Sequence, residues 1–292
     1  MPREKTKLKR KRRGIEILGL DESAEIKKGK ALKVTVFFAG HRREWSEESG
    51  PKAELSMLKY TIEQETKVDY GYPMDLLLVN HYPNEKDLKY DDKFKDEEGY
   101  KTYIDFFNSL NGTETKNGKI ITHDQENKAV SGVGWDYAYQ KYKNDYDYWY
   151  FCEDDVITIK DNVMARAVRA LEQLEDVIFI STLGWWKHAT VKKRVPRGWI
   201  GITKTNYIEK YFTDKEGHIL GTTSDACYWE ERGFKHNQHD EVLISITPQL
   251  DHNKRIEIIP IGSSVVKWKH EERKLDSGPS VVSPWNQDME RF

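Results

Sequence analysis

Residues 147–157 read Asp-Tyr-Trp-Tyr-Phe-Cys-Glu-Asp-Asp-Val-Ile, and this stretch decides which fold the rest of the chain can form. Most of its first half is aromatic or apolar, which is typical of a strand buried on both faces of a sheet. The strand ends in three consecutive carboxylates, Glu153, Asp154 and Asp155. Because adjacent anions repel one another, this position predicts a divalent cation that also carries a diphosphate.

The same carboxylates have a simpler interpretation, in which they cap a helix. A helical pattern begins near Asp161, and aspartate is a common N-cap residue. Asp154 or Asp155 would then serve that helix, with Asp161 as a further cap, and no metal would be needed.

Short apolar runs alternate with amphipathic stretches along the chain from Ala31 onward. The expected strands are Val34–Phe38, Met74–Asn80, Lys119–Thr122, Tyr148–Cys152, Val177–Ser181 and Arg255–Ile261. The expected helices are Glu54–Glu65, Asn127–Lys143, Asp161–Leu174, Thr205–Tyr211 and Asp240–Leu250. Apolar strands that alternate with helices predict an α/β fold with a mostly parallel sheet flanked by helices. The acidic stretch Asp91–Glu98 is expected to be a surface loop.

Composition places the chain among globular proteins, with 292 residues, 37% hydrophobic side chains and a net charge of −2. Charge is uneven, because eight basic residues and one acidic residue, Glu4, lie within residues 1–13. With two cysteines and no apolar run long enough to span a membrane, we expect a cytoplasmic protein without membrane insertion. If the protein is viral, that cytoplasm is the host cell's.

Several enzyme classes lack their sequence signature in this chain. It has no GxxxxGK[ST] loop, no GxGxxG after the first strand, no serine elbow and no HExxH. The sequence therefore argues against P-loop, dinucleotide-binding, serine-hydrolase and zinc-protease chemistry.

The order of elements resembles the nucleotide-sugar-dependent glycosyltransferases of the GT-A fold, with a family-2-like layout. The resemblance is carried by the first strand Val34–Gly40, the small residues Ser131-Gly132-Val-Gly134 before the next buried strand, and Glu153-Asp154-Asp155, which is similar to a variant Asp-x-Asp motif. It implies a Rossmann-like catalytic domain over residues 31–272, between a basic arm, 1–30, and a tail, 273–292. The implied reaction moves a sugar from a nucleoside diphosphate sugar, expected to be a UDP-sugar, to an acceptor hydroxyl.

The resemblance also assigns roles at the donor site. Asp155 would bind Mn²⁺ or Mg²⁺, which stabilises the negative charge that builds on the leaving diphosphate. Glu153 and Asp154 would support it by approaching the ribose or by coordinating through water. Residues expected to line the base, the ribose or the rest of the nucleotide are Phe38, Ala39, Gly40, His41, Arg42, Asn80, Asn127 and Ser131.

A second acidic motif, His239-Asp240-Glu241, opens a predicted helix. It resembles the family's acidic pair, whose aspartate acts as general base in inverting members, so Asp240 is the expected base and Glu241 its reserve. The family usually has Glu-Asp at this point, which leaves the register open between these two residues. A helix cap is the structural alternative.

Two further features complete the expected site. Val266-Lys-Trp-Lys-His270 follows the last strand, where many members of this fold place a histidine ligand, so His270 is expected to bind the metal. Trp185 and Trp186, in a polar stretch that contains glycine, suit stacking on a sugar or a base and are expected to bind the acceptor.

The acceptor has more than one candidate. The basic arm would attract a polyanion, which favours a hydroxylated base in DNA, as in phage-type DNA glycosyltransferases. Glycan and protein acceptors fit the fold equally well. Two other readings stay open: a sugar-phosphate nucleotidyltransferase, for which Ala39-Gly40-His-Arg42 is a weak match to the expected signature, and a non-catalytic nucleic-acid-binding protein.

Overall fold

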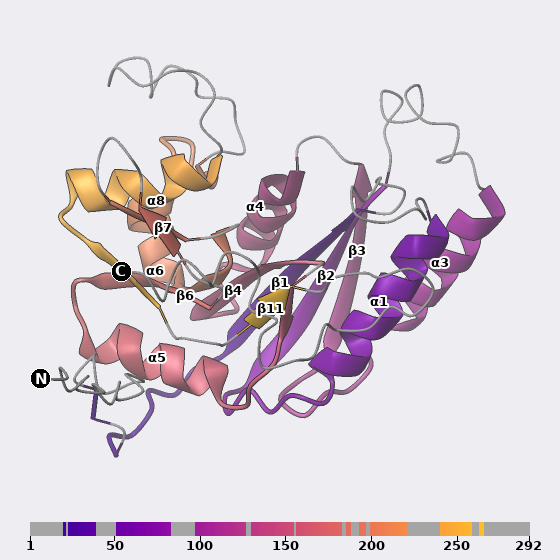
Figure 1. The fold of residues 1–292 in the computed structure, drawn as a ribbon, viewed down its shortest axis with the longest axis horizontal. Coiled ribbons are helices and arrows are strands. Elements are labelled where there is room, and N and C mark those ends of the chain that lie inside the picture. Colours follow the sequence, from indigo (N-terminus) through magenta and orange to yellow (C-terminus); the bar gives the residue numbers. More distant parts are fainter. Residues whose placement is uncertain are drawn as a thin grey trace, which may run out of the picture.

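The computed structural model describes residues 20–21, 23–38, 51–82, 97–126, 130–154, 156–182, 185–187, 193–196, 199–220, 240–258 and 263–265. These residues form a seven-stranded, mostly parallel sheet with helices on both faces (Figure 1). The α/β class and the mostly parallel sheet expected from the sequence are therefore confirmed.

The sheet has the strand order β10-β6-β9-β4-β1-β2-β3. Its strands are β1 (Ala31–Phe38), β2 (Met74–Tyr82), β3 (Ile120–Glu126), β4 (Tyr148–Glu153), β6 (Val177–Ser181), β9 (Gly201–Lys204) and β10 (Arg255–Ile258). Every pairing is parallel except those of β9, which runs antiparallel to both β4 and β6. Burial of strands on both faces explains why β4 and β6 are almost wholly apolar.

Helices cover the two faces of the sheet. The described helical segments are α1 (Pro51–Glu65), α3 (Glu97–Ser109), α4 (Val130–Tyr142), α5 (Val163–Gln173), α6 (Thr205–Tyr207), η4 (Ile208–Phe212) and α8 (Asp240–Asp251). In Figure 1, α1 lies to the right of β1, β2 and β3, and α4 lies to their left, on the opposite face of the sheet. Tyr103 of α3 donates a hydrogen bond to Asn80 of β2, and Tyr148 of β4 donates to Glu172 of α5, which puts α3 and α5 on the α1 face.

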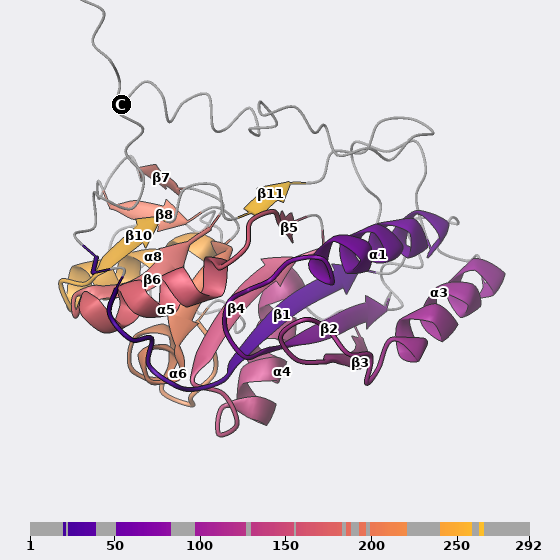
Figure 2. The same ribbon diagram turned by 90° about the horizontal axis from the view of Figure 1, so that it is seen from below.

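Two small ladders flank the main sheet. β5 (Val156–Thr158) pairs antiparallel with β11 (Ser263–Val265), and β7 (Trp185–Lys187) pairs antiparallel with β8 (Arg194–Pro196). Figure 2 shows β5 and β11 side by side near the ends of β1 and β4. The segment after the carboxylate triplet is therefore a strand and not the start of a helix.

This strand overturns the capping interpretation. Asn162, with a left-handed φ of 61°, stands at the N-cap of α5 and makes no side-chain capping bond. Asp161, the expected cap, instead accepts a hydrogen bond from the backbone N–H of Asp69 at 2.8 Å. Because β5 separates Asp154 from α5, this carboxylate does not cap that helix either.

The short strands β5, β7, β8 and β11 were not predicted from the sequence, and neither were α3 and β9. α3 begins at Glu97, inside the stretch expected to be a loop, because Tyr103 and Phe107 supply a buried face after the acidic start. β9 was not predicted, since its four residues follow a glycine-rich, basic segment.

Aromatic side chains fill the core between the sheet and α4. Trp199 is fully buried and stacks on Phe151 and Phe179, with ring centroids 4.8 and 5.2 Å apart. Trp135 of α4 packs beside Phe151, and its indole N–H donates to the carbonyl oxygen of Cys152 at 3.2 Å. The packing fixes α4 over the end of β4.

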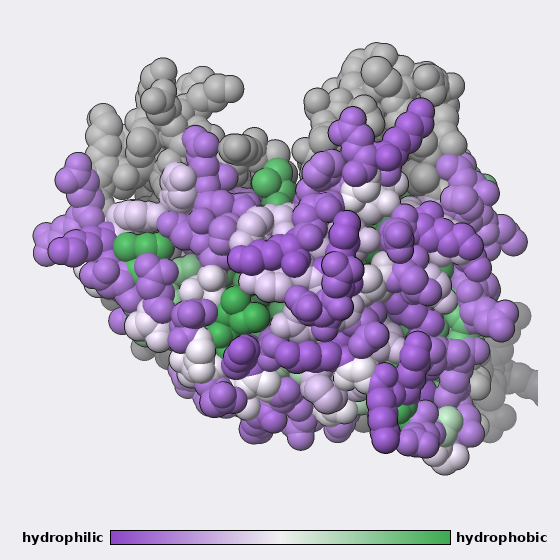
Figure 3. Space-filling view, turned by 180° about the vertical axis from the view of Figure 1, so that it is seen from behind, coloured by the Kyte–Doolittle hydropathy of each residue, from purple (hydrophilic) through white to green (hydrophobic). Residues whose placement is uncertain are grey.

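The outer surface is mostly hydrophilic. Figure 3 shows the back of the molecule, where hydrophobic residues appear only in small, separate patches among the coloured atoms. Residues 20–21 and 23–30, placed in the basic arm by the sequence, pack against the fold: Leu20 and Ile26 contact the core, and Lys30 pairs with Asp75 at 2.7 Å.

Gly134 of α4 allows close approach of helix and sheet. A Cβ at this position would lie 2.7 Å from Val36 Cγ2 and 3.1 Å from His81 Nε2. We expect Gly134→Ala to lower the free energy of unfolding by about 1–3 kcal/mol through overpacking, measured by urea denaturation. This loss opposes the gain of about 1 kcal/mol that alanine normally brings to a helix.

Val36→Ala provides the matched test, because it removes the methyl group that the new Cβ meets. The cost of Gly134→Ala should shrink in the Val36→Ala background. An equal cost in both backgrounds, or a more stable Gly134→Ala protein, would contradict the packing argument.

Candidate functional site

The strand order reverses direction beside β1. The chain builds β1, β2 and β3 outward in one direction and then crosses back to place β4 on the other side of β1. In open α/β sheets, ligands bind outside the carboxyl ends of the strands at such a switch point. The carboxyl ends of β1 and β4, at Phe38 and Glu153, therefore mark the candidate site.

The carboxylate triplet begins at this point. Glu153 is the last residue of β4, and its Oε1 accepts a hydrogen bond from the hydroxyl of Ser131 at 2.5 Å. Asp154 is buried, with its backbone carbonyl accepting from Thr61 Oγ1 of α1 at 3.2 Å. α1 and α4, on opposite faces of the sheet, thus both hold the triplet.

α4 brings Ser131 to the triplet from its first turn. Ser131 is 3% exposed, and Gly134 lets the helix lie close to β1 and β2. The middle of α4 is bound to the turn that follows η4, because Asp136 pairs with His218 Nδ1 at 2.8 Å and accepts from the backbone N–H of Ile219 at 2.8 Å. Ser131, which the sequence analysis expects near the nucleotide, therefore lies beside Glu153.

The β5–β11 ladder brings a distant part of the chain to the triplet. Val265 at the end of β11 is paired with Val156, the residue directly after Asp155. β11 therefore ends beside the triplet, and His270 follows it in the sequence. His270 and Asp155, the predicted metal ligands, themselves lie outside the described residues.

The ends of β2 and β3 form a second polar group. Asn80 is completely buried, its Nδ2 donates to Asp124 Oδ1 at 2.5 Å, and its Oδ1 accepts from the hydroxyl of Tyr103 at 3.0 Å. These bonds turn the amide toward α3 and make Asn80 a support for Asp124. On the α4 face, Gln125 Nε2 lies 2.6 Å from His81 Nε2.

Asp124 is a residue that the sequence analysis missed. It is exposed at the carboxyl edge, in register with Asn80 of β2. The predicted strand ended at Thr122, because the residues after it are polar. Extension of that strand as a polar edge strand would have placed Asp124 at the site edge.

The other predicted residues are only partly described. Trp185 and Trp186 lie in β7, paired with β8, and α8 packs against β8. α8 begins at Asp240, followed by Glu241, so the structure brings the expected base and the β7–β8 hairpin into one region. The side chains of these residues and of Phe38 are outside the described part, as are Ala39, Gly40, His41, Arg42 and Asn127.

No group of three or more His, Cys, Asp or Glu side chains within the described ranges is placed to hold a metal ion. The described ranges supply the oxygen donors of Glu153 and Asp154, the ligand type that Mn²⁺ and Mg²⁺ prefer. Cys152 is buried, and its thiol donates to the carbonyl oxygen of Val156 at 3.3 Å.

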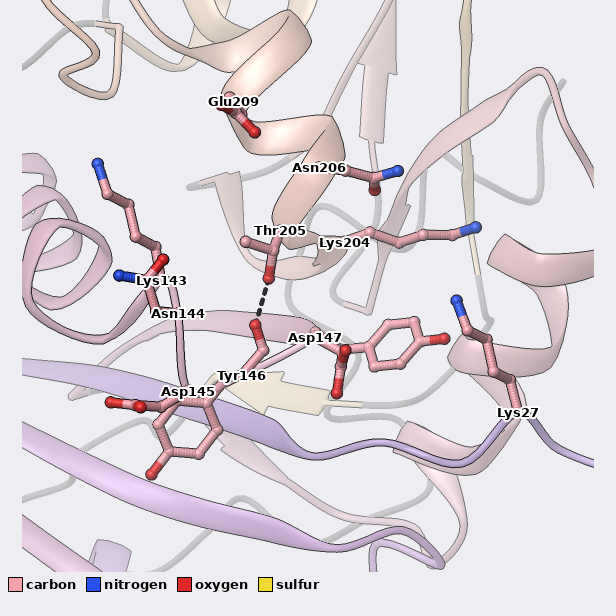
Figure 4. Close-up of a pocket in the computed structure, with 11 residues that line it drawn as sticks. Lys27, Lys143, Asn144, Asp145, Tyr146, Asp147, Lys204, Thr205, Asn206 and Glu209 are labelled. Atoms are coloured by element: carbon pink, nitrogen blue, oxygen red, sulfur yellow. Dashed lines mark hydrogen bonds between the residues drawn. The ribbon is translucent and has the colours of Figure 1, made fainter.

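A hollow of about 330 Å³ lies at the opposite edge of the sheet, where β4 begins (Figure 4). Figure 4 shows the ammonium groups of Lys27 and Lys204 on one side of it, with Lys143 and Asp145 directed to the other. Glu172 pairs with two of the lysines, since Lys204 Nζ lies 2.9 Å and Lys27 Nζ 3.8 Å from its carboxylate oxygens. Burial opposes ionisation of Glu172, but hydrogen bonds from Lys204 and Tyr148 lower its pKa below the usual value. Because Asp145, Asp147 and Glu209 also line the hollow, it offers no unbalanced positive charge to a phosphate.

The chain matches no protein-family model and no curated protein sequence. Among the helices in the described ranges, none is long and apolar enough to cross a bilayer.

Ser131→Ala tests the contact to Glu153. Loss of a hydrogen bond to a charged group should lower the free energy of unfolding by about 1.5–3 kcal/mol, measured by urea denaturation. Ser109→Ala is the matched control, because the Ser109 hydroxyl is exposed and donates only to the carbonyl oxygen of Phe106. If both substitutions lower the free energy of unfolding equally, the hydrogen bond from Ser131 to Glu153 contributes no more stability than an exposed serine contact.

The contact between His218 and α4 predicts a pH dependence. The hydrogen bond to Asp136, together with its charge and those of Asp214 and Glu216, raises the pKa of His218 above 6.5. A raised folded pKa contributes stability that is full below the unfolded value of about 6.5 and is lost as pH rises through the folded value. NMR titration should place the His218 pKa above 6.5, and Asp136→Asn should lower it. A His218 that titrates at 6.5 or below in the wild type would contradict the contact.

Proposed function

We propose that this chain is a metal-dependent glycosyltransferase that moves a sugar from a nucleoside diphosphate sugar to an acceptor hydroxyl. The observation that supports the proposal most is the position of the Glu153-Asp154 carboxylates at the switch point beside β1. A mostly parallel sheet binds nucleotides at this place, and the sequence puts acidic residues there where most nucleotide sites have glycine-rich loops.

The chemistry of sugar transfer explains why carboxylates would be needed. As the bond between sugar and diphosphate breaks, negative charge builds on the leaving group, and Asp155 would hold the Mn²⁺ or Mg²⁺ whose positive charge would stabilise it. Glu153 keeps its orientation through Ser131, and Asp154 is held between the sheet and α1. The side chains therefore enter the site from a rigid strand end and not from an unsupported loop.

The acceptor half of the proposal rests on α8 and the β7–β8 hairpin. α8 begins at Asp240 and packs against β8, so a base at its first residue would lie in the same region as Trp185 and Trp186. In this proposal Asp240 takes the proton from the acceptor hydroxyl and the tryptophans bind the acceptor. An ionised base at this position corresponds to an inverting reaction.

Thermal unfolding with UDP, GDP, TDP and CDP, each with and without Mn²⁺, tests the donor site. A ligand that binds only the folded protein stabilises it by about 2.7 kcal/mol at a hundred times its Kd, which raises Tm by several degrees. We expect a metal-dependent rise with one nucleotide, UDP first, and its loss in Asp155→Asn.

Asp105→Asn is the control, because Asp105 is an exposed carboxylate on α3. It should keep the full metal-dependent rise. If no nucleotide raises Tm with or without Mn²⁺, the transferase proposal fails and a non-catalytic protein becomes the better reading.

The nucleotide found in this way then serves in a transfer assay. Its sugar conjugate is offered with DNA that contains hydroxymethylated bases and, separately, with glycan acceptors. Transfer to the DNA alone supports the role of the basic arm, whereas transfer to glycans alone removes it. Asp240→Asn should abolish transfer and leave nucleotide binding intact.

A further inference from the structure

Lys33 is a charged side chain in the middle of the fold. It lies on β1, and its side chain is 1% exposed. Its ammonium group donates to Glu65 Oε1 at 2.6 Å, to Thr158 Oγ1 at 2.9 Å and to the hydroxyl of Tyr70 at 3.2 Å. An ammonium group has three N–H donors, so all of them have partners.

The surroundings keep Lys33 charged. Burial alone disfavours the ammonium form, but the charge of Glu65 and the nearby Cys152 and Tyr150 outweigh it, and the pKa of Lys33 is raised above its ordinary value. The ammonium group also lies 4.7 Å from the centroid of the Tyr150 ring. Lys33 and Glu65 therefore form a buried ion pair with full hydrogen bonding.

Such a pair needs a reason beyond stability. Removal of two charges from water costs several kcal/mol for each ion, and apolar residues of similar volume often give equal or greater stability. An ion pair also fixes the positions of its neighbours, because each of its hydrogen bonds needs a partner atom in a particular place. The partners of Lys33 and Glu65 therefore show what the pair holds in place.

The main partner is β5. Glu65 Oε1 accepts from the backbone N–H of Thr158 at 3.0 Å, while the Thr158 hydroxyl accepts from Lys33. β5 has three residues, and within the described residues its ladder partner is β11, which is equally short. Two strands of this length are not stable alone, so the ion pair is the fixed point to which they attach.

β5 and β11 both border the carboxylate triplet. β5 starts directly after Asp155, and β11 ends opposite Val156. A second branch of the network runs from Thr158 Oγ1 to the hydroxyl of Tyr150 at 3.4 Å and from there to Thr182 Oγ1 at 3.1 Å. Thr182 follows the end of β6, where the chain continues toward β7.

We propose that Lys33 and Glu65 are positioning residues of the candidate site: through Thr158 they hold β5 and β11, and with them Glu153 and Asp154, in the geometry that binds the metal and the diphosphate. The placement of β5 and β11 stands on the contacts above, whereas the effect on ligand binding rests on the proposed function. Neither residue touches a ligand in this scheme.

The test replaces the ion pair by apolar residues of similar size, Lys33→Met with Glu65→Leu. Hydrogen exchange is followed by mass spectrometry in peptides that cover β5, β11 and β6. We expect amides of β5 and β11 to exchange at least tenfold faster, with β6 unchanged. Mn²⁺-dependent affinity for the stabilising nucleotide should fall at least tenfold.

Lys67→Met with Glu63→Leu is the matched control. This pair lies near the same end of α1, 2.7 Å apart, but both side chains are 61% exposed. It should change neither β5 exchange nor nucleotide affinity. If the Lys33 and Glu65 double variant does not fold, Glu65→Gln is used, which keeps the acceptor oxygen and removes the charge. We then expect a smaller increase in the amide exchange rate, confined to β5 and β11.

Unchanged exchange in β5 and β11 in a folded variant would overturn the proposal. An equal increase in the exchange rates of β5, β11 and β6 would also overturn it, because general destabilisation gives that result. If the wild type binds no nucleotide, the proposed function fails on its own, and the exchange experiment still decides whether the ion pair holds β5 and β11. Faster exchange with unchanged nucleotide affinity would overturn the role in ligand binding.

Discussion

The hydrogen-bonded pairing of β4 with β1 is the constraint on which the rest of the structure depends. β1 has β2 on one side and β4 on the other, so the chain must reverse its direction of travel across the sheet. In open α/β sheets, ligands bind outside the carboxyl ends of the strands at such a reversal. Glu153 and Asp154 stand at this position because they end a strand whose other residues are all buried.

Helices on both faces of the sheet contact the end of β4 at the candidate site. α4 lies close enough to reach Glu153 only because Gly134 has no side chain to meet Val36. α1 reaches the same strand end from the other face, through Thr61 and, deeper in the fold, through Glu65. Glu153 and Asp154 are therefore held from both faces of the sheet.

The two edges of the sheet differ in how their charges are balanced. At the amino edge, Lys204 and Lys27 both meet Glu172, and Lys30 meets Asp75, so each of these cations has a carboxylate partner within the protein. At the carboxyl edge, the described residues place Glu153, Asp154 and Asp124, an excess of acid. A cation supplied from solution would balance this excess, which is the physical basis for expecting a metal there.

The sequence by itself determined the strands Tyr148–Cys152 and Val177–Ser181, the helix that begins at Asp240 and the carboxylates at 153–155, because apolar runs and periodicity are local signals. The sequence analysis missed α3, because the acidic residues at the start of this helix were read as part of a loop. Only the tertiary structure decided that β5 follows the triplet, that β11 returns beside it and that a charged Lys33 lies beneath both. These depend on pairings between residues far apart in the chain, whose free energy comes from burial and from hydrogen bonds that no local pattern specifies.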